Sequence, residues 1–135
     1  MVDLSEKAAL GIAAISDMLG SGIADGFEGF ARSDNFGAAL SRLALETCYA
    51  ENWNAELLSR RERSLMLIAA LVALRQPREL TNHLRLGVAN GVKVEELEEI
   101  LLHLVPYVGF PATSDASAAM RTFIKDNSPD KGSSA

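Results

Sequence analysis

The sequence predicts an all-α protein, a compact bundle of about six helices. Apolar residues recur with a period near 3.6 along most of the chain, and no stretch shows the alternation, bounded by turn residues, that is typical of strands. With 135 residues and a mass of 14.5 kDa, the chain is long enough to build a hydrophobic core of its own. We therefore expect one helical domain over residues 1–128 and a flexible tail over residues 129–135.

The first half of the chain is predicted to hold two helices. The first spans about residues 5–19 and ends at Gly20, and the glycine-rich patch over residues 20–37 is predicted to be loop or frayed helix. The second runs from about residue 36 to residue 52, and Cys48 on this helix is predicted to be a small core residue. The apolar positions of this helix are Leu40, Leu43, Ala44 and Tyr49.

The second half is predicted to hold four helices. Ser59 and Glu62 have the spacing of a capping box, which places the start of the third helix at Ser59. Pro77 suits the first turn of the fourth helix, which is predicted to end in a left-handed stop at Asn90-Gly91. The fifth helix begins near Val94 with acidic residues in its first turn.

Two prolines mark the boundary between the last two predicted helices. Pro106 is expected to kink or terminate the fifth helix, and the last helix is expected to follow Gly109-Phe110-Pro111 and to extend to about Lys125.

Composition and charge exclude several classes of protein. A single cysteine excludes an internal disulfide framework and every CxxC motif, which favours a reducing compartment. The net charge of -5 has the wrong sign for binding nucleic acid through its phosphates. The longest apolar run, residues 65–74, has about half the length that a bilayer core requires and is predicted to be a buried helix. The N-terminus lacks the features of a secretory signal, so we expect no membrane association and a cytoplasmic protein.

The two histidines are the first candidates for chemistry. Glu79 precedes His83 by one helical turn, so both side chains can face one cavity, and the carboxylate is expected to favour the imidazolium form. His103 lies at the edge of the apolar stripe of the next helix, one turn before Tyr107. The same spacing also fits an ordinary helix ion pair and partly exposed histidines. A metal site built from Glu79, His83 and His103 is a further alternative.

Arginines concentrate between residues 59 and 85, although the protein as a whole is acidic. Most of them are expected to be solvated, but one or two inside a cleft would attract an anionic substrate. Arg63 and Arg85 are the candidates for this role, with Tyr107 as a further binding group.

An ordered set of motifs over residues 53–123 resembles the carboxymuconolactone decarboxylase family. This resemblance implies a fold similar to that of the alkylhydroperoxidase D group, whose all-helical subunits assemble into trimers or hexamers. The apolar third helix, which one thin layer of helices does not readily cover, also favours a homo-oligomer. The motifs are Trp53, Leu58–Leu65, Ala69–Leu74, Glu79-Leu80, His83-Leu84-Arg85, Asn90-Gly91-Val92, Glu96-x-x-Glu99 and Tyr107–Ala112.

The resemblance also implies an activity. The peroxidase branch needs a CxxC pair where this chain has Gln76 and Glu79, which leaves the branch similar to the decarboxylases. Those enzymes act without a cofactor on a carboxylated butenolide (4-carboxymuconolactone) in aromatic catabolism. The resemblance implies His83, oriented by Glu79, as the group that stabilises the oxyanion or carries the proton, with His103 as a further donor. The alternatives are a family member that binds a small molecule or a partner without turnover, and a metal-dependent enzyme.

Overall fold

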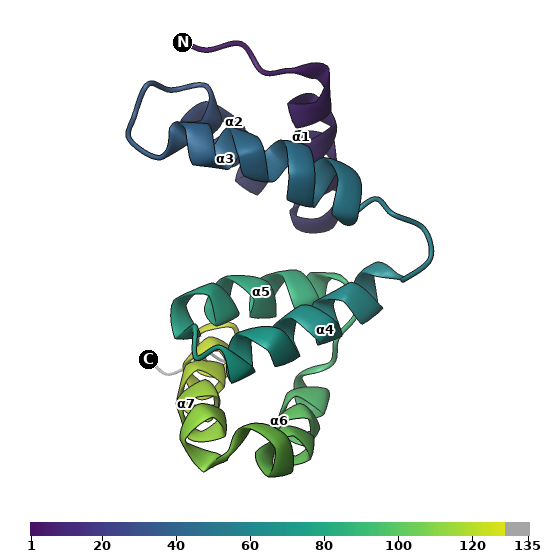
Figure 1. The fold of residues 1–135 in the computed structure, drawn as a ribbon, viewed down its shortest axis with the longest axis vertical. Coiled ribbons are helices and arrows are strands. Elements are labelled where there is room, and N and C mark those ends of the chain that lie inside the picture. The colour runs from purple at the N-terminus through teal and green to yellow at the C-terminus, as the bar shows by residue number, and fades with distance from the viewer. Residues whose placement is uncertain (129–135) are drawn as a thin grey trace. The chain divides into compact units, whose positions relative to one another are not determined.

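The computed structural model describes residues 1–128, and these contain seven α-helices, one π-helix and no strand (Figure 1). The predicted all-α class is confirmed. The helices form two compact units, residues 1–59 and the chain from Arg60 onward. The single domain predicted over residues 1–128 stays a prediction, and the tail predicted over residues 129–135 lies outside the described residues.

The first unit is built from four helical segments: α1 (Glu6–Leu19), α2 (Ser21–Ala31), α3 (Ala38–Ala44) and the π-helix η1 (Leu45–Asn52). The hydroxyl of Ser5 caps α1 by accepting from the backbone N–H of Ala8 at 3.0 Å. Small side chains dominate the core and allow the helices to approach closely. The buried core residues are Ala8, Ile15, Ala24, Ala31 and Leu45.

The prediction that the glycine-rich patch over residues 20–37 is loop or frayed helix is wrong, because most of this patch forms the regular helix α2. Gly20, with φ of +92°, ends α1, and α2 begins at the next residue. Glycine lowers helix stability by about 1 kcal/mol relative to alanine. Burial of Ala24 and Ala31 on one face of α2 offsets this cost, which a propensity argument alone does not register.

The segment predicted as one α-helix over residues 36–52 consists of α3 followed by η1. In a π-helix each N–H bonds five residues back, as Trp53 does to the Cys48 carbonyl at 2.9 Å, so the side chains on one face change. Leu45 is fully buried on the same face as Ala38, seven residues earlier, whereas Leu40 and Leu43 lie on other sides of α3 and are exposed. The prediction that Cys48 is a core residue is wrong, because its thiol is exposed.

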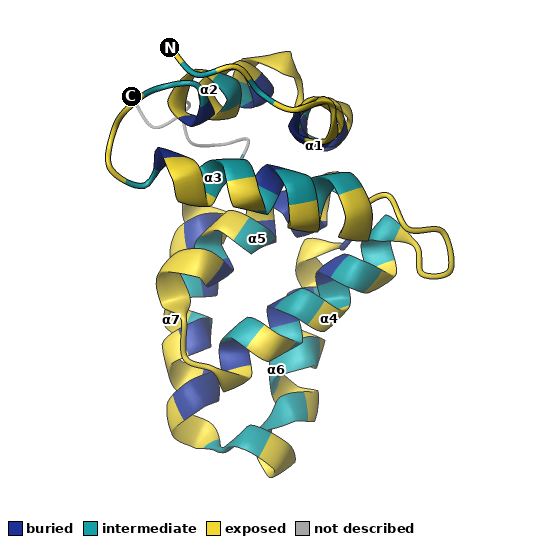
Figure 2. Ribbon diagram, turned by 45° about the horizontal axis from the view of Figure 1, so that its top comes forward, coloured by how far each residue is buried: buried dark blue, intermediate teal, exposed yellow. Residues whose placement is uncertain are grey.

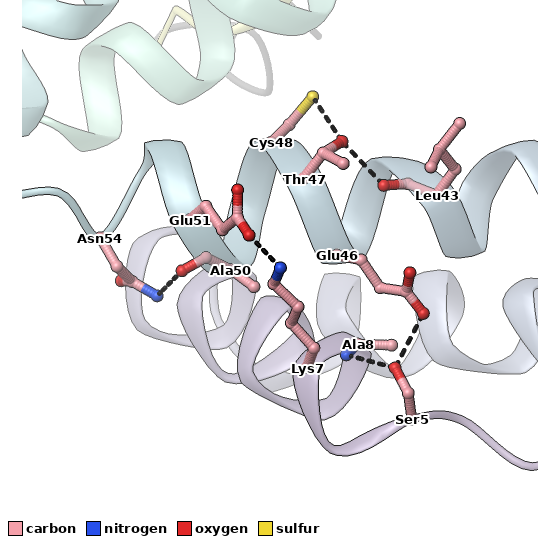
Figure 3. A network of polar contacts seen from close by, with 10 residues as sticks. All are labelled: Ser5, Lys7, Ala8, Leu43, Glu46, Thr47, Cys48, Ala50, Glu51 and Asn54. Carbon is pink, nitrogen blue, oxygen red and sulfur yellow. Dashed lines mark hydrogen bonds and ion pairs between the residues drawn. The ribbon is translucent and has the colours of Figure 1, made fainter.

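Polar side chains of η1 contact residues at the start of α1 (Figure 3). The Ser5 hydroxyl donates to Oε1 of Glu46 at 2.8 Å, and Lys7 forms an ion pair with Glu51. The sulfur of Cys48 points away from these α1 side chains in Figure 3. The register between α1 and η1 thus places polar contacts at their edge and apolar side chains between them.

The second unit consists of the four predicted helices: α4 (Arg60–Ala73), α5 (Pro77–Ala89), α6 (Val94–Val108) and α7 (Phe110–Asp126). Leucine and β-branched side chains at helical spacing meet in one core, and α5 packs against both α4 and α7. The core residues are Ile68, Val72, Leu80, Leu84, Val92, Leu97, Ala116, Met120 and Phe123.

The ends of these helices follow the predicted residues closely. Pro77 occupies the first turn of α5, and Gly91, with φ of +102°, forms the stop after it. α6 continues through Pro106 and ends at Val108, because Gly109, with φ of +90°, turns the chain. α7 begins at Phe110, one residue before the proline that was expected to precede it.

The apolar run on α4 is only partly buried, which corrects the expectation of a buried helix (Figure 2). Ile68 and Val72 are covered, but Met66 is 57 % exposed and Leu74 is 67 % exposed. A two-layer arrangement of four helices covers one side of α4 and leaves the other open. Among the described residues, no helix has both the length and the apolar character needed to cross a membrane.

Candidate active site

His83 lies on α5 one turn after Glu79, as the spacing predicts. Leu80 and Leu84 anchor this helix in the core and thereby fix the direction in which the imidazole projects. The side chain of His83 is 18 % exposed and that of Glu79 is 55 % exposed, and Nε2 of His83 lies 3.9 Å from Oε2 of Glu79. This separation is too long for a hydrogen bond, so the carboxylate acts on the imidazole through its charge.

Burial decides the protonation state of His83. It lowers the pKa of the imidazole below the ordinary value of 6.5, and the charge of Glu79, which raises the pKa, offsets only part of this effect. Glu79 therefore acts in the expected direction, toward the imidazolium form, but burial outweighs its effect. At neutral pH, His83 is a neutral imidazole that donates through one nitrogen and accepts through the other.

We expect His83 to titrate with a midpoint below 6.5 in the folded protein, and Glu79→Gln to lower this midpoint further because it removes the charge that raises the pKa. The unfolded chain takes up the proton first as the pH falls. The stability that neutral His83 contributes is therefore complete above about pH 6.5 and is lost between that pH and the lower folded-state pKa. NMR of the imidazole C–H signals measures both midpoints, and a midpoint of 6.5 or above would contradict the assignment.

His103 lies in a different environment, on the rim of an open groove between α4 and α6. The groove has a volume of about 420 Å³, and its lining residues include neither Glu79 nor His83. His103 itself is exposed, and its ring lies 5.8 Å from that of Tyr107, centre to centre. The lining residues are Leu65, Ala69, Glu96, Glu99, Ile100, His103 and Leu104.

The three groups predicted to bind an anionic substrate differ in exposure. Arg63 is partly buried on α4, Arg85 is exposed on α5, and Tyr107 is 77 % exposed on α6. Arg85 follows His83 by two residues, or about 200° around the helix, so these two side chains leave α5 on opposite sides. Of the two arginines, Arg63 has the more sheltered position.

The alternative metal site is not assembled in the described part of the chain. No group of three or more His, Cys, Asp or Glu side chains within residues 1–128 is close enough to hold one metal ion. Glu79, His83 and His103 therefore do not converge on a common point within this chain.

One polar cluster in the second unit was not predicted as such. Arg61 on α4 forms an ion pair with Glu96 on α6 and donates from Nε to the carbonyl of Gly91 at 3.3 Å. Oε1 of Glu96 also accepts from the backbone N–H of Lys93 at 2.8 Å. The cluster ties α4 to the turn between α5 and α6. Sequence spacing suggests the local contact between Lys93 and Glu96, but the arginine lies 35 residues away from its carboxylate partner.

Glu96→Gln is expected to lower the melting temperature at neutral pH. Hydrogen bonds from Arg61 and from the Lys93 backbone lower the pKa of Glu96 below 4.5, so the carboxylate contributes stability above about pH 4.5 that is lost as the pH falls through the folded-state pKa. The difference from the unmodified protein should shrink over that range in thermal unfolding at a series of pH values. Glu95→Gln, at an exposed neighbouring position, is the matched control and should change little.

These features define an all-helical subunit with a mostly buried histidine and a neighbouring carboxylate on one core helix. Residues 38–122 match the model of the carboxymuconolactone decarboxylase family, and the chain belongs to this family. The family predicted from the sequence is thus confirmed. The matched segment contains every candidate site residue, from Arg63 to Tyr107.

Two relatives with assigned names support the same conclusion. The chain is 38 % identical over 94 residues to a 4-carboxymuconolactone decarboxylase of Acinetobacter baylyi, a match that covers 70 % of this chain and 67 % of the relative. It is 30 % identical over 84 residues to a nitrosuccinic acid decarboxylase of Metarhizium robertsii, covering 62 % of this chain and 59 % of the relative. Both are named as decarboxylases, which confirms the predicted enzyme class, a carboxy-lyase.

Proposed function

We propose that this protein decarboxylates a small anionic lactone of the 4-carboxymuconolactone type, in aromatic catabolism and without a cofactor. The observation that carries the proposal is the neutral, mostly buried imidazole of His83, 3.9 Å from Glu79, in a chain that is 38 % identical to a named 4-carboxymuconolactone decarboxylase. Cytoplasmic location and assembly into a homotrimer or homohexamer form part of the same proposal.

The substrate supplies its own electron sink. As the bond to the carboxylate breaks and carbon dioxide leaves, the electron pair passes through the ring alkene to the lactone carbonyl oxygen, and a proton then adds to carbon. The nitrosuccinic acid named for the second relative offers a comparable sink in its nitro group. In both reactions negative charge develops on oxygen, and no organic cofactor is needed to accept it.

His83 is suited to stabilise this developing charge. A neutral imidazole donates a hydrogen bond to an oxyanion, and burial strengthens that interaction because water does not compete for it. Glu79 fixes the electrostatic surroundings of the ring as a positioning residue. We propose that Arg63 and Arg85 attract the substrate carboxylate, and that Tyr107 and His103 act as secondary donors.

A substrate panel tests the proposal. The purified, folded protein is incubated with 4-carboxymuconolactone, with nitrosuccinate and with a lactone that lacks the carboxylate, and both carbon dioxide release and the loss of butenolide absorbance are recorded. We expect turnover of the carboxylated lactone and none of the unsubstituted lactone. Turnover of nitrosuccinate alone would overturn the substrate class, and the absence of turnover on the whole panel would overturn the proposed activity.

A further inference from the structure

The outward face of α4 is apolar and uncovered. Met66 is 57 % exposed, Leu74 is 67 % exposed, and Ala70 between them is also exposed. Leu74 directly follows α4 and keeps its register, since its backbone N–H donates to the carbonyl of Ala70 at 2.9 Å. A spacing of four residues therefore aligns these three side chains on one side, and we call them the α4 stripe. Arg75 and Arg78, both exposed, follow at its C-terminal end. A wholly apolar run of ten residues that stays half uncovered is typical of a surface that another protein buries.

A second apolar surface lies between α6 and α7 in the same unit. It is a groove of about 700 Å³ with Leu97, Leu101 and Met120 among its lining residues. Three further apolar lining residues are open to solvent: Val94 at 40 %, Leu102 at 65 % and Ile124 at 38 %. We call this surface the α6–α7 groove.

The α6 edge of this groove is acidic. Glu95, Glu98 and Glu99 line it and are exposed, and among residues 1–128 no ion pair engages any of the three. Arg121 lies among the lining residues from α7. The α6 edge therefore presents three carboxylates beside the apolar floor.

The two surfaces complement each other in length and in charge. The α4 stripe and the α6 side of the groove, Val94–Leu102, each extend over eight residue steps, about 12 Å at the rise of an α-helix. Both have an apolar centre, and the arginines beside the stripe have the opposite sign to the glutamates beside the groove. In a chain with a net charge of -5, such local pairing offsets the general repulsion between two copies.

We propose that the α4 stripe of one copy docks into the α6–α7 groove of a second copy. The inference rests on the homo-oligomer of the proposed function and specifies the interface that builds it. Because the two surfaces differ, each copy presents its stripe to one neighbour and its groove to another. Contacts of this kind close into rings, the symmetry of a trimer or of the layers of a hexamer.

Two variants that each damage one surface test the interface. Leu74→Asp places a charge in the stripe, and Leu102→Asp places one in the groove; both sites are exposed, so each subunit should keep its helical circular dichroism. Light scattering at micromolar concentration should give an oligomer for the unmodified protein and a 14.5 kDa monomer for each variant. An equimolar mixture should give a particle of two chains, because the intact groove of the first variant receives the intact stripe of the second.

Other results overturn the interface. A monomeric unmodified protein, an oligomer that survives either variant, or variants that stay monomeric when mixed would each exclude it. Leu40→Asp, an exposed leucine in the first unit, is the matched control and should leave the oligomer intact. If an aspartate variant loses its helical signal, Met66→Asp in the stripe and Ile124→Asp in the groove, both at exposed positions, replace the pair with the same readouts. Mass is measured without substrate, so failure here is distinct from failure of the decarboxylase proposal.

Discussion

His83→Ala lowers kcat on the carboxylated lactone by roughly a hundredfold or more, the largest effect on activity that we expect from any single substitution. Removal of one preorganised hydrogen-bond donor from a developing oxyanion costs about 2.7 kcal/mol or more. His83 fits this role because its imidazole is neutral, mostly buried and held on a helix whose neighbouring leucines are in the core. KM should change less than kcat, since the negative charge on oxygen develops in the transition state and is absent from the bound substrate.

Glu79→Gln should cost less activity than His83→Ala. The carboxylate lies 3.9 Å from Nε2 and acts on the imidazole rather than on the substrate, so its loss should mainly shift the pH profile of kcat/KM toward lower pH. Asn82→Ala, at an exposed position beside the histidine, is the control and should leave both kcat and the profile unchanged.

A purely structural role for His83 predicts a different pattern of results. In that case His83→Ala lowers the melting temperature and leaves kcat nearly unchanged. Both quantities are therefore measured on the same preparation. Full turnover in His83→Ala would contradict the catalytic assignment and would transfer it to His103 and Tyr107.

Gly11→Ala destabilises the first unit by about 1–3 kcal/mol or more, the largest effect on stability that we expect. A Cβ at this position would lie 2.3 Å from the carbonyl oxygen of Leu45 and 2.9 Å from its carbonyl carbon. These are backbone atoms, so no side chain can rotate away, and η1 has to move as a segment. Thermal unfolding at a fixed protein concentration measures the loss.

Gly26→Ala is the matched control for this substitution. Gly26 lies inside α2, and a Cβ there would meet no atom within 4 Å. Alanine should therefore raise stability by about 0.5–1 kcal/mol through its higher helix propensity. If Gly11→Ala also raised stability, the close backbone packing between α1 and η1 would be refuted.

The second half of the chain has a structure that its sequence predicts more closely than the first half does. The helices from Arg60 onward could be located because strong apolar periodicity coincides there with residues that start and stop helices, such as Pro77 and Gly91. In the first half, glycine-rich α2 and the π-helix depend on packing between segments. Neither the burial of Ala24 nor the hydrogen-bond register of η1 is visible in a local pattern.

The same division applies to the candidate site. The family, the four helices of the second unit and the position of Glu79 one turn before His83 could all be predicted, because each depends on order and spacing along the chain. Packing in three dimensions was needed to establish that burial outweighs the Glu79 charge at His83, that His103 lines a different groove, and that Cys48 and Leu74 are exposed. Burial depends on which segments cover a side chain, and those segments come from distant parts of the sequence.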